Sequence, residues 1–401
     1  MHYIKLLRPP EVEEGRAKGS RQPSLKIVLA ITTDLGDAYL SPRDPIPLSV
    51  IGAYVEKKDG RERLVPVSLP LILPHGTISQ DAPKWQAGMR VLKFSVALPL
   101  QPLKTVQIRP FSPQLTALST GDICAAKQGL IMAAYSDVTQ PGGLLAPSVC
   151  FRSLRLPVAG QLLQFEEDIG DSIARHIWDG GVVTVSLLAD MCLESSGRTG
   201  RNILPAVRSI LTDSSQGPLN ILEIGCGIGV LGIGLARTLS LRHNAGTTRV
   251  LMTDLPEAEE KARANIARQI GAQGAGLVDL DFEPLDWEDG KNGVFGEKVQ
   301  SRSWNLVVVS DCTYNTDTLL PLVKTFSAIR RHSASQSLGD NRPVETKIFL
   351  ATKPRHSSER AFCKLMSDDG WITKEQAALP LPMLDGEQQS VELYLFEKMQ
   401  S

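Results

Sequence analysis

A glycine-rich segment between an apolar strand and an apolar helix constrains the fold of this chain more than any other feature. The segment reads Glu223-Ile-Gly225-Cys-Gly227-Ile-Gly229, and it follows directly on the apolar run 220–225. Glycines let the backbone turn sharply and let a ligand approach where a Cβ would otherwise stand. The helix that begins there offers free N–H groups and the positive end of its dipole, which suit a ligand carboxylate. The segment therefore predicts a ligand-binding strand–loop–helix unit.

Strands and helices alternate through the rest of the chain after about residue 160. Apolar strand-like runs occupy 220–225, 249–254, 276–282, 305–311, 346–352 and 391–398. Helical stretches occupy 171–195, 230–239, 256–271, 316–331 and 358–370. Such alternation is typical of βαβ units and a parallel sheet. Two polar, glycine- and serine-rich segments, 287–303 and 332–343, are predicted to be surface insertions.

The first 150 residues have a different pattern. A chain of 401 residues exceeds a comfortable single core, which suggests two domains. Short β-like runs broken by proline and glycine predict a β-rich module of unassigned role over 23–150. Residues 1–22 are predicted to be an irregular leader, 139–148 a linker, and 160–401 the α/β domain.

Composition and charge exclude several classes of protein. The formal net charge of −1 gives no electrostatic case for binding nucleic acid or an anionic membrane. Six scattered cysteines without a CxxC pair or a close histidine argue against a metal site and against a disulfide scaffold. The N-terminus lacks a signal-peptide core, and no apolar run reaches the roughly 18 residues of a spanning helix. We therefore expect a soluble protein of the cytoplasm or nucleus; nothing in the sequence indicates its oligomeric state.

The glycine segment alone does not identify the ligand, since Gly227-x-Gly229-x-x-Gly232 also matches the dinucleotide fingerprint. Glu223 is expected at the exit of the strand, where its carboxylate could hold an ammonium group and would repel a pyrophosphate. Asp254 ends the next strand, where an acid can accept hydrogen bonds from ribose hydroxyls. Because Asp254 suits both kinds of cofactor, the choice depends on the downstream motifs.

Five motifs follow one another over roughly 165–400, and the glycine segment is part of the second. They are IWDGG at 177–181, ILEIGCGIGVLGIGLA at 221–236, TDLPEAEEKARANI at 253–266, LDW at 285–287 and VVVSDCTYN at 307–315. In sequence and in order these motifs resemble methyltransferase family 16, the seven-β-strand protein-lysine methyltransferases. The resemblance implies a class I methyltransferase domain, a Rossmann-like α/β fold with a mostly parallel seven-stranded sheet. It does not extend to the N-terminal module.

The resemblance also implies S-adenosyl-L-methionine as cofactor and a role for each matching residue. Residues that would surround the methionine part are Glu223, Gly225, Gly227 and Gly229. Asp254 would bind the ribose, Leu255 would lie beside the adenine, and Trp178 would close over the cofactor. Other residues that would contact the cofactor are Asp286, Trp287 and Ser310. Asp311 and Tyr314 would form the Asp-x-x-Tyr motif at the mouth of the substrate site.

Each of these residues also has a purely structural interpretation. Trp178 and Trp287 could be core aromatics, Asp311 could be a helix N-cap before the Thr/Asp-rich turn that follows it, and Tyr314 could simply pack. The glycines could form an ordinary turn.

The activity implied by the resemblance is transfer of a methyl group to a protein, with a lysine side chain as the acceptor. A small-molecule methyltransferase remains open because a fold does not determine an acceptor. So does an interaction protein that binds the cofactor without turnover. A nicotinamide-dependent dehydrogenase is the most distant alternative.

Overall fold

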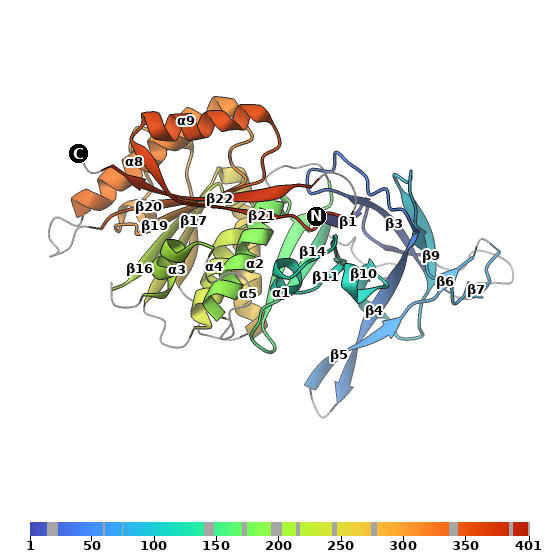
Figure 1. Ribbon diagram of the computed structural model, residues 1–401. Coiled ribbons are helices and arrows are strands. Elements are labelled where there is room, and N and C mark those ends of the chain that lie inside the picture. Colours follow the sequence, from blue (N-terminus) through green and yellow to red (C-terminus); the bar gives the residue numbers. More distant parts are fainter. Residues whose placement is uncertain are drawn as a thin grey trace.

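The computed structural model describes residues 1–13, 23–58, 61–73, 75–139, 148–170, 175–193, 203–213, 217–242, 247–273, 279–336, 344–384 and 388–399. An N-terminal β-rich half and a C-terminal α/β half lie side by side (Figure 1).

The C-terminal half is built on one mostly parallel sheet. Its strands are β16 (Leu219–Ile224), β17 (Thr248–Asp254), β18 (Asp279–Pro284), β19 (Leu306–Ser310), β20 (Lys347–Thr352), β21 (Trp371–Pro380) and β22 (Ser390–Lys398). In the described residues the strand order is β18-β17-β16-β19-β20-β22-β21. The first five strands run parallel, and β22 pairs antiparallel with both β20 and β21. The predicted α/β domain with a mostly parallel sheet agrees with this topology.

Helices cover both faces of this sheet. They are α2 (Asp179–Leu193), α3 (Pro205–Thr212), α4 (Val230–Ser240), α5 (Glu259–Gln273), α6 (Trp287–Gly290), α7 (Glu297–Gln300), α8 (Leu319–Gln336) and α9 (Ala361–Asp368). Short 3₁₀ helices occupy Pro256–Ala258, Thr316–Thr318 and Ser357–Arg360. Because successive strand side chains point to opposite faces, Ile221 packs with α2 to α5 and Leu222 packs with α8 and α9.

The N-terminal half consists of short and long strands. They are β1 (His2–Leu6), β2 (Glu11–Glu13), β3 (Ser24–Thr32), β4 (Ile46–Lys58), β5 (Arg61–Ser68), β6 (Leu71–Ile72), β7 (Ile78–Ser79), β8 (Lys84–Trp85), β9 (Leu92–Ala97), β10 (Leu103–Pro110), β11 (Thr116–Ala117), β12 (Ile131–Met132), β13 (Ala134–Asp137), β14 (Val149–Arg155) and β15 (Leu162–Asp168). The helical elements are a 3₁₀ turn at Pro113–Leu115 and α1 (Thr120–Cys124). One sheet follows the order β11-β12-β1-β3-β9-β6-β7 and a second the order β15-β14-β13-β10-β4-β5. Apolar side chains of β1, β3, β4 and β10 meet in a common core between them.

The predicted irregular leader over 1–22 is wrong for its first residues. Residues 2–6 form β1, which pairs antiparallel with β3 and parallel with β12 inside the first N-terminal sheet. Tyr3 and Ile4 are fully buried there. These residues form a strand because they pair with β12, more than a hundred residues further along the chain, and the local sequence gives no sign of this pairing. Residues 14–22 lie outside the described part of the chain.

The predicted end of the N-terminal module at residue 150 falls too early in the chain. Strands β14 and β15 extend the second N-terminal sheet to residue 168, beyond the expected end at 150. Leu163 and Phe165 of β15 belong to the same buried cluster as the residues of α2 and α4. The two halves therefore share a core instead of meeting across a linker. Most of the predicted linker, 140–147, lies outside the described residues.

The predicted surface insertion 287–303 is partly buried. It contains α6 and α7, and its Phe295 and Val299 pack beneath α8 in the second core of the α/β half. In the other predicted insertion α8 continues to Gln336, and 337–343 lie outside the described residues. Within the ranges given above, no helix combines the length and apolar character needed to cross a membrane.

Candidate active site

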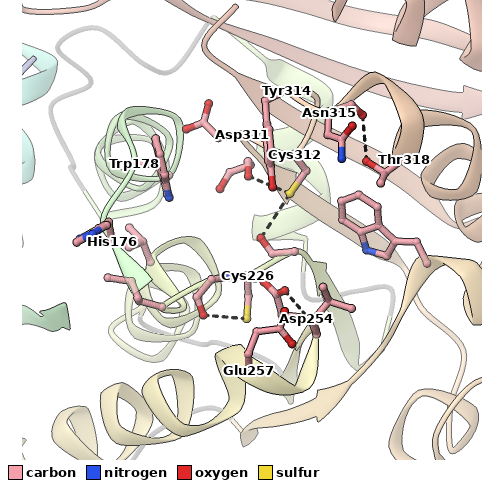
Figure 2. Close-up of a pocket in the computed structure, with 18 of the residues that line it drawn as sticks. His176, Trp178, Cys226, Asp254, Glu257, Asp311, Cys312, Tyr314, Asn315 and Thr318 are labelled. Atoms are coloured by element: carbon pink, nitrogen blue, oxygen red, sulfur yellow. Dashed lines mark hydrogen bonds between the residues drawn. The ribbon is translucent and has the colours of Figure 1, made fainter. Parts of the chain in front are cut away.

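A cavity of about 750 Å³ opens at the carboxyl ends of β16, β17 and β19. This is the edge of a parallel sheet where ligands bind in open α/β folds. Figure 2 shows side chains from β17, the segment just before α2 and the segment after β19 around this space. Of the residues predicted from sequence, those lining it are Trp178, Gly225, Gly227, Asp254, Leu255, Asp286, Trp287, Ser310, Asp311 and Tyr314.

The glycine loop forms the floor of the cavity. Gly225 and Gly227 have φ of 68° and 53°, a region that favours glycine. A Cβ at Gly225 would lie 2.3 Å from the Cys312 sulfur, so the loop also packs too tightly there for any side chain. Gly229 is buried at the start of α4 and, contrary to the prediction, does not line the cavity.

Glu223 is likewise not brought to the cavity, so the direct contact with a ligand ammonium group that we expected is absent from this geometry. Its side chain is fully buried, and its Oε2 accepts a hydrogen bond of 2.9 Å from the N–H of Gly232 in α4. Strand alternation explains this position, because Glu223 shares the face of β16 that Ile221 presents to the helices. Burial raises the pKa of Glu223 well above its ordinary value. Glu223 therefore supports the helix behind the loop.

Asp254 stands at the end of β17 with its carboxylate at the cavity. One oxygen accepts a hydrogen bond from Gly227 N–H and the other accepts one from Leu255 N–H, each with a length of 2.7 Å. Each carboxylate oxygen can accept a second hydrogen bond, so capacity remains for a ligand hydroxyl. Burial raises the pKa of Asp254, and the two backbone donors oppose that rise.

Two tryptophans and an acid line other parts of the cavity. Trp178 lies just before α2, and Trp287 begins α6. Asp286 caps α6, since its Oδ1 accepts from Glu288 N–H over 2.9 Å, and it remains exposed. Both indoles are only partly buried, and Trp287 also packs against the second core of the α/β half.

Asp311 is held by backbone groups from two other elements. Its Oδ2 accepts a hydrogen bond of 2.7 Å from Gly180 N–H, and its Oδ1 accepts one of 2.9 Å from Lys353 N–H. Asp311 has a φ of 51°, in the left-handed region that an aspartate seldom adopts. Burial raises the pKa of Asp311 to about 6, against the opposing effect of the Arg355 charge. Asp311 is therefore not the N-cap of the helix that follows it, because Asn315 has that role. Its carboxylate instead accepts from the first turn of α2 and still lines the cavity.

Tyr314 lies at the rim and is 55% exposed, which rules out simple packing. In Figure 2 Asp311 and Tyr314 come from the same segment, beside Cys312. Burial raises the pKa of the Tyr314 hydroxyl, so it remains protonated and able to donate at neutral pH.

The sequence prediction missed a charged cluster beside Asp311. Arg355 lines the cavity with its guanidinium 5.0 Å from the centre of the Trp178 ring. It also donates two hydrogen bonds, of 2.8 and 3.2 Å, to Asp34 of the N-terminal half. The position of Arg355 just past β20 could have suggested it, since it follows a strand at the ligand-binding edge. Nothing in the local sequence signals Asp34.

The charges around the cavity are mainly negative. Lining carboxylates are Asp254, Glu257, Asp286, Glu288 and Asp311. Arg355 is paired with Asp34, and His176 is the other basic side chain of the lining. Such a surface attracts a cation and repels a phosphate.

Strand order, glycine loop and the acid at the end of β17 define a class I methyltransferase domain. A family model described as lysine methyltransferase matches residues 158–369, slightly more than half of the chain, and the chain belongs to that family. This confirms the resemblance inferred from the motifs. The protein is an S-adenosyl-L-methionine-dependent methyltransferase. The cavity fits this cofactor, because Asp254 retains acceptor capacity for hydroxyls and the carboxylates suit a sulfonium charge.

Individual relatives are more distant. A UPF0665 family protein of Schizosaccharomyces pombe is 24% identical over 375 residues, covering 92% of this chain and 94% of its own length. Among solved structures, an S-adenosylmethionine-dependent methyltransferase of Methanosarcina mazei is 14% identical, covers 45% of this chain and 93% of its own, and has a TM-score of 0.31. TYW2 of P. horikoshii, solved with MeSAdo, is 10% identical, covers 66% of this chain and 75% of its own, and has a TM-score of 0.33.

Proposed function

We propose that this protein methylates the side-chain nitrogen of a lysine in a protein substrate. The observation that carries the proposal is the position of Asp311 and Tyr314 at the open mouth of a cavity whose charge is mainly negative. A lysine ammonium is attracted by that charge, whereas the phosphates of a nucleic acid are repelled.

In this proposal the cofactor lies over the glycine loop. Asp254 accepts from the ribose hydroxyls, and Leu255, Asp286 and Trp287 surround the adenine. The backbone of Gly225 and Gly227 borders the methionine part. Ser310 and Trp178 border the side that faces Asp311. When bound, the cofactor supplies an electrophilic methyl group, and the protein supplies position and charge.

The open rim favours a macromolecular acceptor. Tyr314 and Leu35 line the cavity and are 55% and 46% exposed. Exposed apolar side chains grouped around a cavity are typical of a surface that contacts another protein. An enzyme for a small molecule is more commonly built around an enclosed pocket.

Asp311 would orient the attacking amine and lower the cost of bringing it into the cavity. Its oxygens each accept one backbone hydrogen bond, so each can still accept another from the substrate ammonium. The lysine must lose a proton before it attacks, because its reference pKa near 10.4 keeps it charged at neutral pH. With its pKa of about 6, Asp311 is ionised at neutral pH and can hold the ammonium until a proton leaves through the mouth.

The test is transfer of labelled methyl groups from the cofactor to an extract of cells that lack this protein, followed by mass spectrometry of labelled peptides. We expect labelled lysine, and we expect Asp311→Asn to reduce labelling. Asp44→Asn, an exposed aspartate of the N-terminal half, is the matched control and should behave as wild type. Label found only in small molecules would refute a protein substrate. Cofactor binding without any label would instead indicate an interaction protein.

A further inference from the structure

The turn 33–37 of the N-terminal half reaches the cavity of the α/β half. Leu35 of this turn lines the cavity and is 46% exposed, as noted above. It stands out because none of the other lining residues comes from the first 168 residues, in the part of the chain that the structure describes.

The turn is held rigidly. Thr33 N–H donates to Ala38 O over 3.0 Å, and Thr33 Oγ1 donates to Asp37 Oδ1 over 2.6 Å. Lys5 of β1 donates to the carbonyl of Asp34 over 2.7 Å, which ties the turn to the sheet. A rigid turn presents Leu35 without the entropic cost of ordering a loop when a substrate binds.

Asp34 connects this turn to the active site. It is 2% exposed, and its carboxylate accepts from Arg355, from Lys353 Nζ over 2.9 Å and from Asp179 N–H over 3.2 Å. Burial alone would raise the pKa of Asp34, but hydrogen bonds and charges of Arg355 and Lys353 outweigh it and hold the pKa well below its usual range. Asp34 is therefore a buried, ionised anchor between the two halves.

Asp34 and Asp311 accept hydrogen bonds from the same two segments, the start of α2 and the residue that follows β20. At the start of α2, Asp179 N–H donates to Asp34 and the next amide, Gly180 N–H, donates to Asp311. Lys353 donates to Asp34 through its side chain and to Asp311 through its backbone. Removing Asp34 would thus loosen both donors that position the Asp311 carboxylate.

Arg355 connects Asp34 to Trp178, which also lines the cavity. Its guanidinium is held by Asp34 and lies over the Trp178 ring. Because Asp34 accepts from the segments that also donate to Asp311, the turn that carries Leu35 is next to the Asp311 side of the cavity.

From these contacts we infer that the turn 33–37 is part of the methyl-acceptor site, with Leu35 contacting the substrate protein beside its lysine and Asp34 positioning Asp311 and Trp178. The inference deepens the proposed function and rests on it. Leu35 is a specificity residue, and Asp34 is a positioning residue that touches neither substrate nor cofactor.

The test of Leu35 compares Leu35→Ala with Leu100→Ala in the full-length protein. Leu100 is a fully exposed leucine of the same half that does not line the cavity. Loss of one leucine contact should raise KM for the protein acceptor about tenfold. The value of kcat and the cofactor Kd, measured by calorimetry, should stay within about twofold of wild type. Leu100→Ala should change none of the three.

The test of Asp34 uses Asp34→Asn and a pH profile of kcat/KM. Charged groups facing Asp311 are Asp34 from the turn, Asp179 from α2, and Arg355 and Lys353 after β20. The neighbouring Cys312 thiol is titratable but uncharged, because burial raises its pKa well above the ordinary value. Loss of the Asp34 charge, with Arg355 no longer paired, should move the acidic limb of the profile to lower pH and reduce kcat. A merely structural role would lower the amount of folded protein without moving that limb.

The outcomes separate this inference from the proposed function. If wild type methylates protein and Leu35→Ala keeps the wild-type KM, the inference is overturned while the proposed function stands. If wild type labels only small molecules, both are overturned. Should Asp34→Asn fail to fold, the Leu35 comparison still decides the matter.

Discussion

The backbone N–H of Gly180 donates a hydrogen bond of 2.7 Å to the carboxylate of Asp311, which lies 131 residues further along the chain. A Cβ built on Gly180 would lie 2.4 Å from the same carboxylate oxygen, so the contact leaves no room for a side chain. The first turn of α2 and the segment after β19 are thus fitted directly to each other at the cavity.

This fit predicts that Gly180→Ala impairs methyl transfer. The added methyl group must push the Asp311 carboxylate away by about 1 Å, and misplacement of that size can cost about 100-fold in rate. The measurement is kcat with labelled cofactor, alongside a thermal melt. Gly121→Ala is the control, since Gly121 also lies in the first turn of a helix, α1, and its Cβ would meet only ordinary contacts. Wild-type kcat in Gly180→Ala would contradict the role given to Asp311.

For Glu223 we predict that a conservative substitution leaves cofactor binding almost unchanged. Burial raises the pKa of Glu223 well above its ordinary value, which favours the uncharged form, and Gln is uncharged and similar in shape. Glu223→Gln should therefore keep the cofactor Kd within about threefold, because a hydrogen bond to Gly232 N–H can still be accepted. Glu223→Ala should lower the melting temperature, because it leaves that donor unpaired and opens a cavity. If Glu223→Gln weakened cofactor binding about tenfold or more, that result would contradict this prediction and support the direct contact with the ammonium group that the sequence suggests.

The two acids of the glycine region show how far the sequence could predict this site. Asp254 follows the last apolar residue of a strand, and the rule that parallel strands end at one edge is enough to bring it to the cavity. Glu223 lies inside a strand, where alternation decides its direction, and the ligand motif alone points the wrong way. Asp34 could not be found at all, because its role depends on how two halves of the chain pack together. Strand β1 could not be predicted for the same reason, because it forms by pairing with β12, which is distant in sequence.

Asp254→Asn tests the ribose contact proposed for Asp254. An amide can replace only part of the acceptor capacity, and its NH₂ would face Gly227 N–H or Leu255 N–H, which are both donors. Hydrogen bonds to a charged group contribute about 1.5 to 3 kcal/mol, so the cofactor Kd should rise by about 10- to 100-fold. Calorimetry measures this directly. Asp289→Asn, an exposed aspartate of α6, should leave Kd unchanged, and an equally unchanged Kd in Asp254→Asn would refute the contact.

The pH dependence of kcat/KM should report Asp311. With its pKa of about 6, this carboxylate gains a proton as the pH falls through 6 and then no longer attracts the lysine ammonium. Deprotonation of the lysine alone gives log(kcat/KM) a slope of about 1 at neutral pH, and the slope should steepen to about 2 below pH 6. In Asp311→Asn the residual activity should keep a slope of about 1 throughout. If the wild-type profile does not steepen between pH 7 and 5, protonation of Asp311 does not control kcat/KM, and this prediction is refuted.

The shared core predicts how the whole chain unfolds. Met132 and Phe165 of the N-terminal half and Leu231 of α4 lie in one buried cluster. Across the same junction, Lys261 of α5 forms ion pairs of 2.7 and 2.8 Å with Glu166 and Asp168 of β15. Neither half can expose its side of this cluster without losing much of its buried apolar surface, so calorimetry should show a single cooperative transition. The cofactor stabilises only the folded state, and adding it should move that whole transition to higher temperature. Two separate transitions, with the cofactor moving only one of them, would mean that the N-terminal half folds independently.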